Sequence, residues 1–135
     1  MDPDNPVVRL CVEGMQAEAR SLFLQAWTAR QDDFDACIAA HYVAGQQEQP
    51  EGALRWNQVA LDRADAVGDD RLRSFYPSLY LNPGWAHEQL GNRLEAERCY
   101  EQAASRLDRL QAGPYRDVVQ TGIATGLERT AQPNE

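Results

Sequence analysis

Apolar residues recur along most of the chain at intervals of three and four, which is the spacing of a buried helix face. Leu22, Phe23, Ala26 and Trp27 form one such stripe, and a second stripe runs from Phe34 to Tyr42. No segment shows the convincing alternation of apolar and polar residues that is typical of a half-buried strand. The pattern therefore predicts an all-α protein.

Glycine and proline divide this pattern into about seven helices. A short first helix is expected to end at Gly14, and later helices are expected to end near Gly45, at Gly68 and at Gly91. The polar stretch "GQQEQPEG" at 45–52 predicts a loop, because it combines polar residues with proline and glycine. In "QDDFDA" at 31–36, Asp32 or Asp33 is expected to cap a helix. The last helix is expected to begin at Pro114.

The segment 78–91, "SLYLNPGWAHEQLG", carries a Pro-Gly pair inside an amphipathic pattern. One interpretation places Asn82 as the cap of a new helix, with Pro83 in its first turn. The other keeps one helix from about 70 to 90, with a bend of more than about 20° at Pro83. We favour the bent helix, because the short helix of the first interpretation would be marginal and Gly84 can serve as a packing residue.

Two stretches repeat the same spacing of small and aromatic residues. "GMQAEARSLFLQA" at 14–26 and "GNRLEAERCYEQA" at 91–103 each place glycine, alanine, an aromatic residue and alanine at successive intervals of five, four and three. A partial copy has Ala53 and Ala60, with Asn57 in the aromatic position and Trp56 one place earlier. The repeated positions are Gly14, Ala19, Phe23 and Ala26, and then Gly91, Ala96, Tyr100 and Ala103.

This spacing resembles the second helix of a tetratricopeptide repeat (TPR), whose period is 34 residues. The chain also resembles small bacterial TPR proteins through "ALDRADAVGD" and "SFYPSLYLN". The resemblance implies a short α-solenoid of about three antiparallel helix pairs plus a C-terminal capping helix. Residues 1–135 would form one domain, with repeats at about 5–29, 32–67 and 70–111 and the cap at about 114–130. The step of 43 residues from Ala53 to Ala96 departs from the standard period.

The net charge of the chain argues against some classes of binding partner. The formal net charge is −8, and such a charge repels phosphate backbones and anionic membrane surfaces. We therefore expect binding neither to nucleic acid nor to membranes. The N-terminus does not resemble a signal peptide, and no apolar run reaches the length of a membrane span. Cys11, Cys37 and Cys99 have no disulfide-like or CxxC spacing, so a cytoplasmic protein is expected.

A TPR-like fold implies a concave surface, lined by the first helix of each repeat, that holds a peptide or a partner helix. The alternative is that these side chains cover the inner surface or pack against the capping helix. The residues that this resemblance assigns to the groove are Phe34, Cys37, His41, Ser78, Leu81, Trp85, Glu88 and Gln89. A clamp for a peptide carboxylate is not expected, because the corresponding positions lack lysine and arginine.

Candidate chemistry is sparse. Cys37 and His41 lie four residues apart, and His87 and Glu88 follow on a later helix, so one interpretation is a zinc site with these four ligands. A buried thiol with ordinary histidines is the favoured interpretation, and no cofactor, metal or catalytic residue is predicted.

We expect a non-catalytic protein–protein interaction module that binds a peptide or partner helix. The alternatives are an accessory subunit of an enzyme or biosynthetic complex that holds a small ligand or metal, and a structural homo-oligomer. A homodimer is plausible, because short solenoids expose apolar ends.

Overall fold

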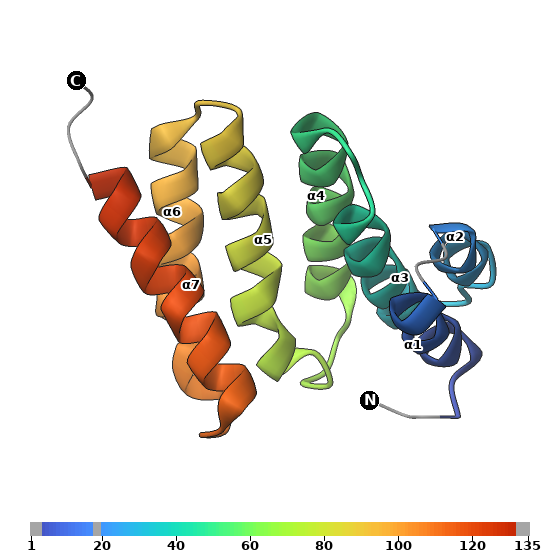
Figure 1. Cartoon of the computed structure of the whole chain (residues 1–135). Coiled ribbons are helices and arrows are strands. Elements are labelled where there is room, and N and C mark those ends of the chain that lie inside the picture. Colours follow the sequence, from blue (N-terminus) through green and yellow to red (C-terminus); the bar gives the residue numbers. More distant parts are fainter. Residues whose placement is uncertain (1–3, 18–19, 132–135) are drawn as a thin grey trace. The chain divides into compact units, whose positions relative to one another are not determined.

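The computed structural model describes residues 4–17 and 20–131, and within the first range only the side chains of residues 4–11 (Figure 1). All regular structure in these residues is helical and none is a strand, which confirms the predicted all-α class. The α-helices are α1 (Pro6–Ala17), α2 (Arg20–Thr28), α3 (Asp33–Gly45), α4 (Pro50–Ala66), α5 (Tyr76–Gln89), α6 (Arg93–Ala104) and α7 (Pro114–Ala131), and short 3₁₀ turns span Arg73–Phe75 and Leu107–Arg109.

The chain divides into two compact units, which are described separately. Unit 1 comprises the described residues up to Leu72, with helices α1 to α4. Unit 2 comprises the described residues from Arg73 onward, with helices α5 to α7. The first two predicted repeats fall in unit 1, and the third repeat from Arg73 onward falls in unit 2 with the capping helix. The grouping of all three repeats into one TPR-like domain stays a prediction.

Three helix boundaries differ from the expected ones. Helix α1 continues through Gly14 to Ala17, because a helix tolerates an interior glycine at a cost of about 1 kcal/mol. Helix α4 begins at Pro50, within the predicted loop, since proline suits the first turn of a helix. The helix expected from about residue 70 begins only at Tyr76, after the 3₁₀ turn, and Pro77 lies in its first turn.

Helix α3 is the central element of unit 1. It packs against α1, α2 and α4, and α3 and α4 form an antiparallel hairpin (Figure 1). As expected, Asp32 caps the helix, and its Oδ1 accepts a hydrogen bond from the Asp35 backbone N–H at 2.8 Å. The buried Asp35 carboxylate accepts bonds from Asn5 Nδ2 at 2.7 Å and from the Gln31 N–H at 3.1 Å. These bonds fasten the chain before α1 and the turn before α3 to one helix end.

Aromatic rings connect the helices of unit 1. Phe23 of α2 stacks on Tyr42 of α3, with ring centroids 5.5 Å apart. Trp27 of α2 meets Trp56 of α4 edge to face at 5.1 Å. Trp56 therefore supplies the aromatic contact, while Asn57 in the expected aromatic position is a buried polar side chain. Phe23, Ala26 and Ala60 are fully buried and Ala53 is half-buried; Ala19 lies outside the described residues, and Gly14 is described only as part of the α1 backbone.

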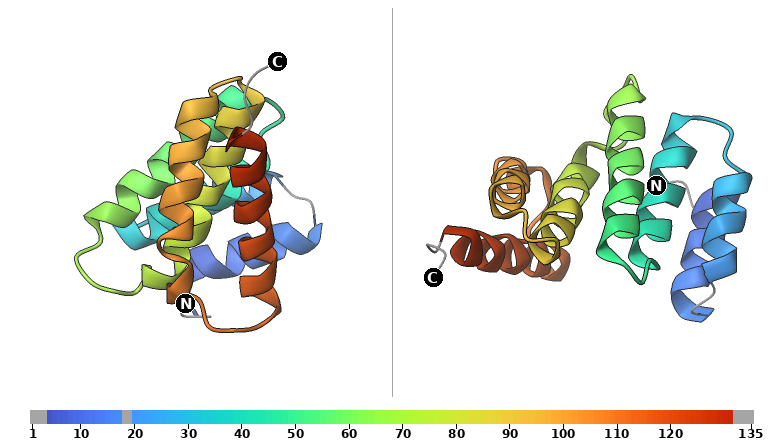
Figure 2. Two further views of the ribbon diagram at one scale, coloured as in Figure 1. Left: turned by 90° about the vertical axis from the view of Figure 1, so that its left-hand side faces the viewer. Right: turned by 90° about the horizontal axis from the view of Figure 1, so that it is seen from above.

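Unit 2 consists of the antiparallel pair α5 and α6, with α7 packed against both (Figure 2). The turn after α5 depends on Gly91, whose φ of 81° is strained for other residues. The Gly91 N–H donates to Glu88 O at 3.1 Å and the Asn92 N–H to His87 O at 2.9 Å, which is a Schellman motif. Gly91 is exposed and no side chain approaches it, so its expected packing role is wrong. It ends the helix instead.

The Tyr100 ring of α6 lies between two glycines of neighbouring helices. A Cβ at Gly84 of α5 would lie 2.8 Å from this ring, and a Cβ at Gly126 of α7 would lie 2.5 Å from it. Ala96 and Ala103 of α6 are fully buried, as a close approach of helices requires. Helix α5 runs without interruption through Pro83 and Gly84, so the prediction of one continuous helix is confirmed. The bend at Pro83 stays a prediction.

The two glycines of α7 allow a matched test of this packing. Gly126→Ala adds a methyl 2.5 to 2.7 Å from three Tyr100 ring atoms, and we expect a loss of about 2–3 kcal/mol in unfolding free energy. Gly122→Ala is the control, because the nearest atom is 3.4 Å away on the Leu81 side chain. Alanine has a higher helix propensity than glycine, so we expect Gly122→Ala to raise the unfolding free energy by up to about 1 kcal/mol. Equal changes for the two variants in urea unfolding would contradict this packing.

Candidate functional site

The groove residues expected on α3 do not form an open surface. Phe34 is 5% exposed and Cys37 is fully buried, while His41 is half-buried. The reason is the central position of α3, which α1, α2 and α4 surround. The Arg71 guanidinium also lies 4.7 Å from the Phe34 ring centroid and covers it further. The prediction that Phe34 and Cys37 line an open groove is therefore wrong.

The groove residues expected on α5 are partly covered by α7. Ser78 is buried, and its hydroxyl lies 2.5 Å from the Tyr115 hydroxyl of α7. Leu81 is half-buried and faces Gly122 of α7, at a distance of ordinary van der Waals contact for an added Cβ. Ser78 and Leu81 therefore pack against α7, the predicted capping helix, and do not line an open groove. This is the alternative that the sequence analysis gave for these side chains.

A charged network joins α5, α6 and α7 further along the same stripe. Glu88 Oε2 accepts a hydrogen bond from Arg129 Nε at 2.5 Å, and Glu88 Oε1 accepts one from Arg129 Nη2 at 3.0 Å. The Tyr100 hydroxyl also donates to Glu88 Oε1, at 2.7 Å. The pKa of Glu88 is lowered, chiefly by the Arg129 bond and further by the Tyr100 bond, so this carboxylate stays ionised.

Trp85 and Gln89 are the residues of the predicted α5 groove set that remain exposed. The Trp85 side chain is 53% exposed, which is unusual for so large an apolar group. The Arg129 guanidinium lies 5.9 Å from the Trp85 ring centroid, and the Arg129 side chain is 44% exposed. We call Trp85, Gln89 and Arg129 the Trp85 face. It combines an aromatic anchor with polar neighbours on α5 and α7. The hydrogen bonds of Glu88 with Arg129 and Tyr100, which we call the Glu88 network, hold these two helices together.

The sequence reasoning missed the contribution of α7 to this face. Arg129 lies far from α5 in the sequence, and no motif marked it. The spacing of Gly122 and Gly126 within an apolar helix was the available signal, because small residues at helix spacing allow a close neighbour.

The candidate metal ligands are divided between the two units, with Cys37 and His41 in unit 1 and His87 and Glu88 in unit 2. No group of three histidine, cysteine, aspartate or glutamate side chains in the described part of the chain is placed to hold a metal ion. Burial, with a smaller effect of the Asp65 charge, raises the pKa of the Cys37 thiol to about 12. A thiol that stays protonated is a poor nucleophile and a poor metal ligand. On the α5 side, His87 Nδ1 lies 3.2 Å from Asn92 Nδ2.

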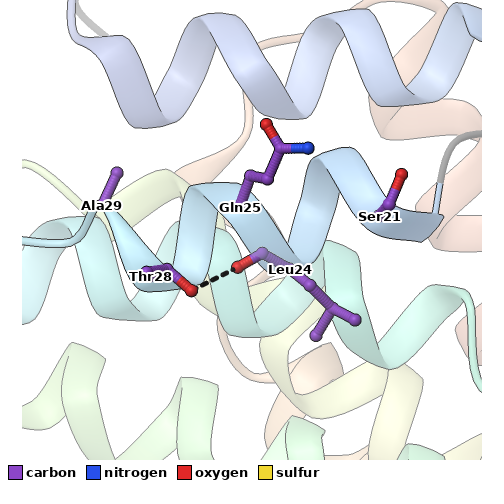
Figure 3. A pocket seen from close by; sticks show the side chains of 5 residues that line it. All are labelled: Ser21, Leu24, Gln25, Thr28 and Ala29. Carbon is purple, nitrogen blue, oxygen red and sulfur yellow. Dashed lines mark hydrogen bonds between the residues drawn. The ribbon is translucent and has the colours of Figure 1, made fainter.

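A shallow surface depression on α2 was not anticipated from the sequence. Its lining consists of Ser21, Leu24, Gln25, Thr28 and Ala29 (Figure 3). The Thr28 hydroxyl donates a hydrogen bond to the backbone oxygen of Leu24 at 3.0 Å, so this hydroxyl is already engaged. None of the lining side chains is ionisable, and the depression offers no acid, base or metal ligand.

Comparison with known proteins identifies no relative. No family model, curated protein or solved structure matches the chain. None of the helices in the described residues combines the length and the apolar character that crossing a bilayer requires. The TPR resemblance therefore rests on the residues of this chain itself.

Because His41 is half-buried, we expect the unfolding free energy of unit 1 to depend on pH. Burial lowers the pKa of His41 to about 4, below the value of 6.5 for an exposed histidine. Between these two pH values the unfolded chain binds more protons, so the unfolding free energy falls as the pH falls. We expect a loss on the order of 2–3 kcal/mol between pH 7 and pH 4 from this group.

The measurement is urea unfolding of the wild type and of His41→Gln across this pH range. Carboxylates titrate alike in both proteins, so the difference between the two stability curves isolates the histidine. The difference should change steadily between pH 6.5 and pH 4. Parallel curves would show that His41 does not titrate as its burial requires.

Proposed function

We propose that the chain is a TPR-like, non-catalytic interaction module that binds a peptide or a partner helix at the Trp85 face. The observation that carries the proposal is the exposure of Trp85 on a helix whose other expected groove positions are largely covered. Exposed tryptophan and arginine side chains are the residue types that most often dominate binding energy at protein interfaces.

The rigidity of the face supports the same proposal. Glu88 fixes Arg129 beside Trp85, and the Tyr100 hydroxyl fixes Glu88 in turn. A surface that is already ordered loses little conformational entropy when a partner binds. The close packing of Gly84, Ala96, Tyr100 and Ala103 supports the TPR-like character of the α5–α6 pair.

We also propose a cytoplasmic location. The three cysteines are free, and Cys11 and Cys37 are buried. A protein without disulfides suits a reducing compartment.

Selection from a library of random peptides of about 12 residues tests the proposal. Peptides that bind the wild type are then measured by fluorescence anisotropy against Trp85→Ala and against Leu94→Ala. Leu94 on α6 is the matched control, since it is a large apolar side chain that is 56% exposed and is not one of the residues joined in the Glu88 network. We expect Trp85→Ala to weaken binding about tenfold or more and Leu94→Ala to change it less than about twofold.

Both variants change exposed side chains, so circular dichroism should show an unchanged helical content. Selected peptides that bind Trp85→Ala as tightly as the wild type would place the binding surface elsewhere. A library that yields no binding peptide would contradict the proposed function as a whole.

A further inference from the structure

Arginine side chains gather at one end of unit 2. The beginning of α5, the end of α6 and the beginning of α7 lie together at this end (Figure 1). The turn Arg73–Phe75 leads into α5, and the turn Leu107–Arg109 follows α6. The arginines of these segments are Arg73, Arg106, Arg109 and Arg116.

Two of these arginines lie over a pair of tyrosines from α5. Tyr76 and Tyr80 have ring centroids 6.3 Å apart. The Arg106 guanidinium lies 4.7 Å from the Tyr80 centroid, and the Arg109 guanidinium lies 5.5 Å from the Tyr76 centroid. We call these four residues the arginine–tyrosine surface. Contact with an aromatic face holds a guanidinium in place while its N–H groups can still donate to another acceptor.

The arginines at this end have no carboxylate partner in the described part of the chain, whereas four of the nine other arginines have one. Arg63, Arg71, Arg98 and Arg129 each form an ion pair with a carboxylate. Among the described residues, no carboxylate lies within ion-pairing distance of Arg73, Arg106, Arg109 or Arg116. Arg106 and Arg116 donate only to neutral oxygens, those of Gln102, Ser105 and Leu110. Their positive charges are not neutralised by a partner within the described chain.

The charge of this end is opposite to that of the whole protein. The formal net charge of the chain is −8, and 13 of its 21 acidic residues precede Arg73. The segments at the arginine end contribute three carboxylates, Glu101, Asp108 and Asp117, against four arginines. A local positive surface on an acidic protein attracts a negative partner to one place and repels it from others.

We propose that the arginine–tyrosine surface binds an acidic peptide segment of a partner protein. Guanidinium groups match carboxylates with two parallel hydrogen bonds, and all 13 basic residues of this chain are arginine. A nucleic acid is the less favoured polyanion, because its long phosphate backbone would meet the repulsion of the net negative charge. This surface is separate from the Trp85 face, and the proposal does not depend on binding there.

The probe is a synthetic peptide of about ten residues in which glutamate alternates with glycine, labelled at one end. Its binding to the full chain is measured by fluorescence anisotropy at low ionic strength. A peptide with glutamine in place of glutamate reports any attraction that is not due to charge. We expect the glutamate peptide to bind and the glutamine peptide to bind at least about tenfold more weakly.

Two double variants with the same net charge locate the contact. Arg106→Gln/Arg109→Gln removes the proposed contacts, and we expect binding to weaken at least about fivefold. Arg55→Gln/Arg98→Gln removes two exposed arginines of α4 and α6, and we expect a change of less than about twofold. Arg106 also donates hydrogen bonds to Gln102 and Ser105, so its replacement can disturb the end of α6. Arg109→Gln alone therefore serves as a second variant, and it should also weaken binding.

Several outcomes would overturn the proposal. Equal weakening by the two double variants would indicate a general charge effect. Equal binding of the two peptides would exclude carboxylate recognition. Tighter binding of a single-stranded oligonucleotide of the same charge, at the same arginines, would identify the wrong class of partner. Loss of self-association in Arg106→Gln/Arg109→Gln would assign the surface to a second copy of the chain. Trp85→Ala should leave peptide binding unchanged, which separates this test from that of the Trp85 face.

Discussion

The position of the Tyr100 ring between Gly84 and Gly126 sets the geometry of unit 2. Neither glycine could carry a Cβ without meeting the ring at 2.8 Å or less, so α5 and α7 each place their backbone directly against the ring. The hydroxyl at the tip of the same ring donates to Glu88, which is ionised and paired with Arg129. One side chain therefore supplies both the apolar contact and the polar link among three helices. The Arg93 guanidinium adds a further link from α6 to the Thr130 backbone oxygen at 2.6 Å.

The same packing explains which residues are available to a partner. By holding α7 against α5, it covers Ser78 and Leu81 and leaves Trp85 and Gln89 exposed. It also brings Arg129 to the edge of the Trp85 ring. The opposite end of unit 2 has a different character, because Arg106 and Arg109 lie over tyrosine rings without a carboxylate partner in the described chain. Two surfaces of distinct chemistry, one aromatic and one cationic, are thus presented by a single three-helix unit.

Local sequence patterns predicted the helices and their ends better than they predicted how the helices pack against one another. The helix class, the cap at Asp32 and the stop at Gly91 follow from backbone chemistry that a few neighbouring residues determine. The repeated spacing identified Tyr100 as a packing residue, because it lies at a fixed distance from small residues, and the TPR resemblance identified Gly84 as one. The burial of Phe34 and Cys37 could not be read in this way, since it depends on how α1 and α2 pack against α3. Arg129 and Gly126 were missed for the same reason: their partners lie on helices distant in the sequence.

The most direct test of this account is amide hydrogen exchange in the full-length protein with Tyr100→Leu. Leucine fills part of the space between the two glycines, but it lacks the hydroxyl that donates to Glu88 and the flat ring that both helices contact. The account predicts faster exchange in α7 and in α5 around Gly84, with unchanged exchange in α3 and α4 of unit 1. Unchanged protection of α7 in this variant would contradict the central role of Tyr100.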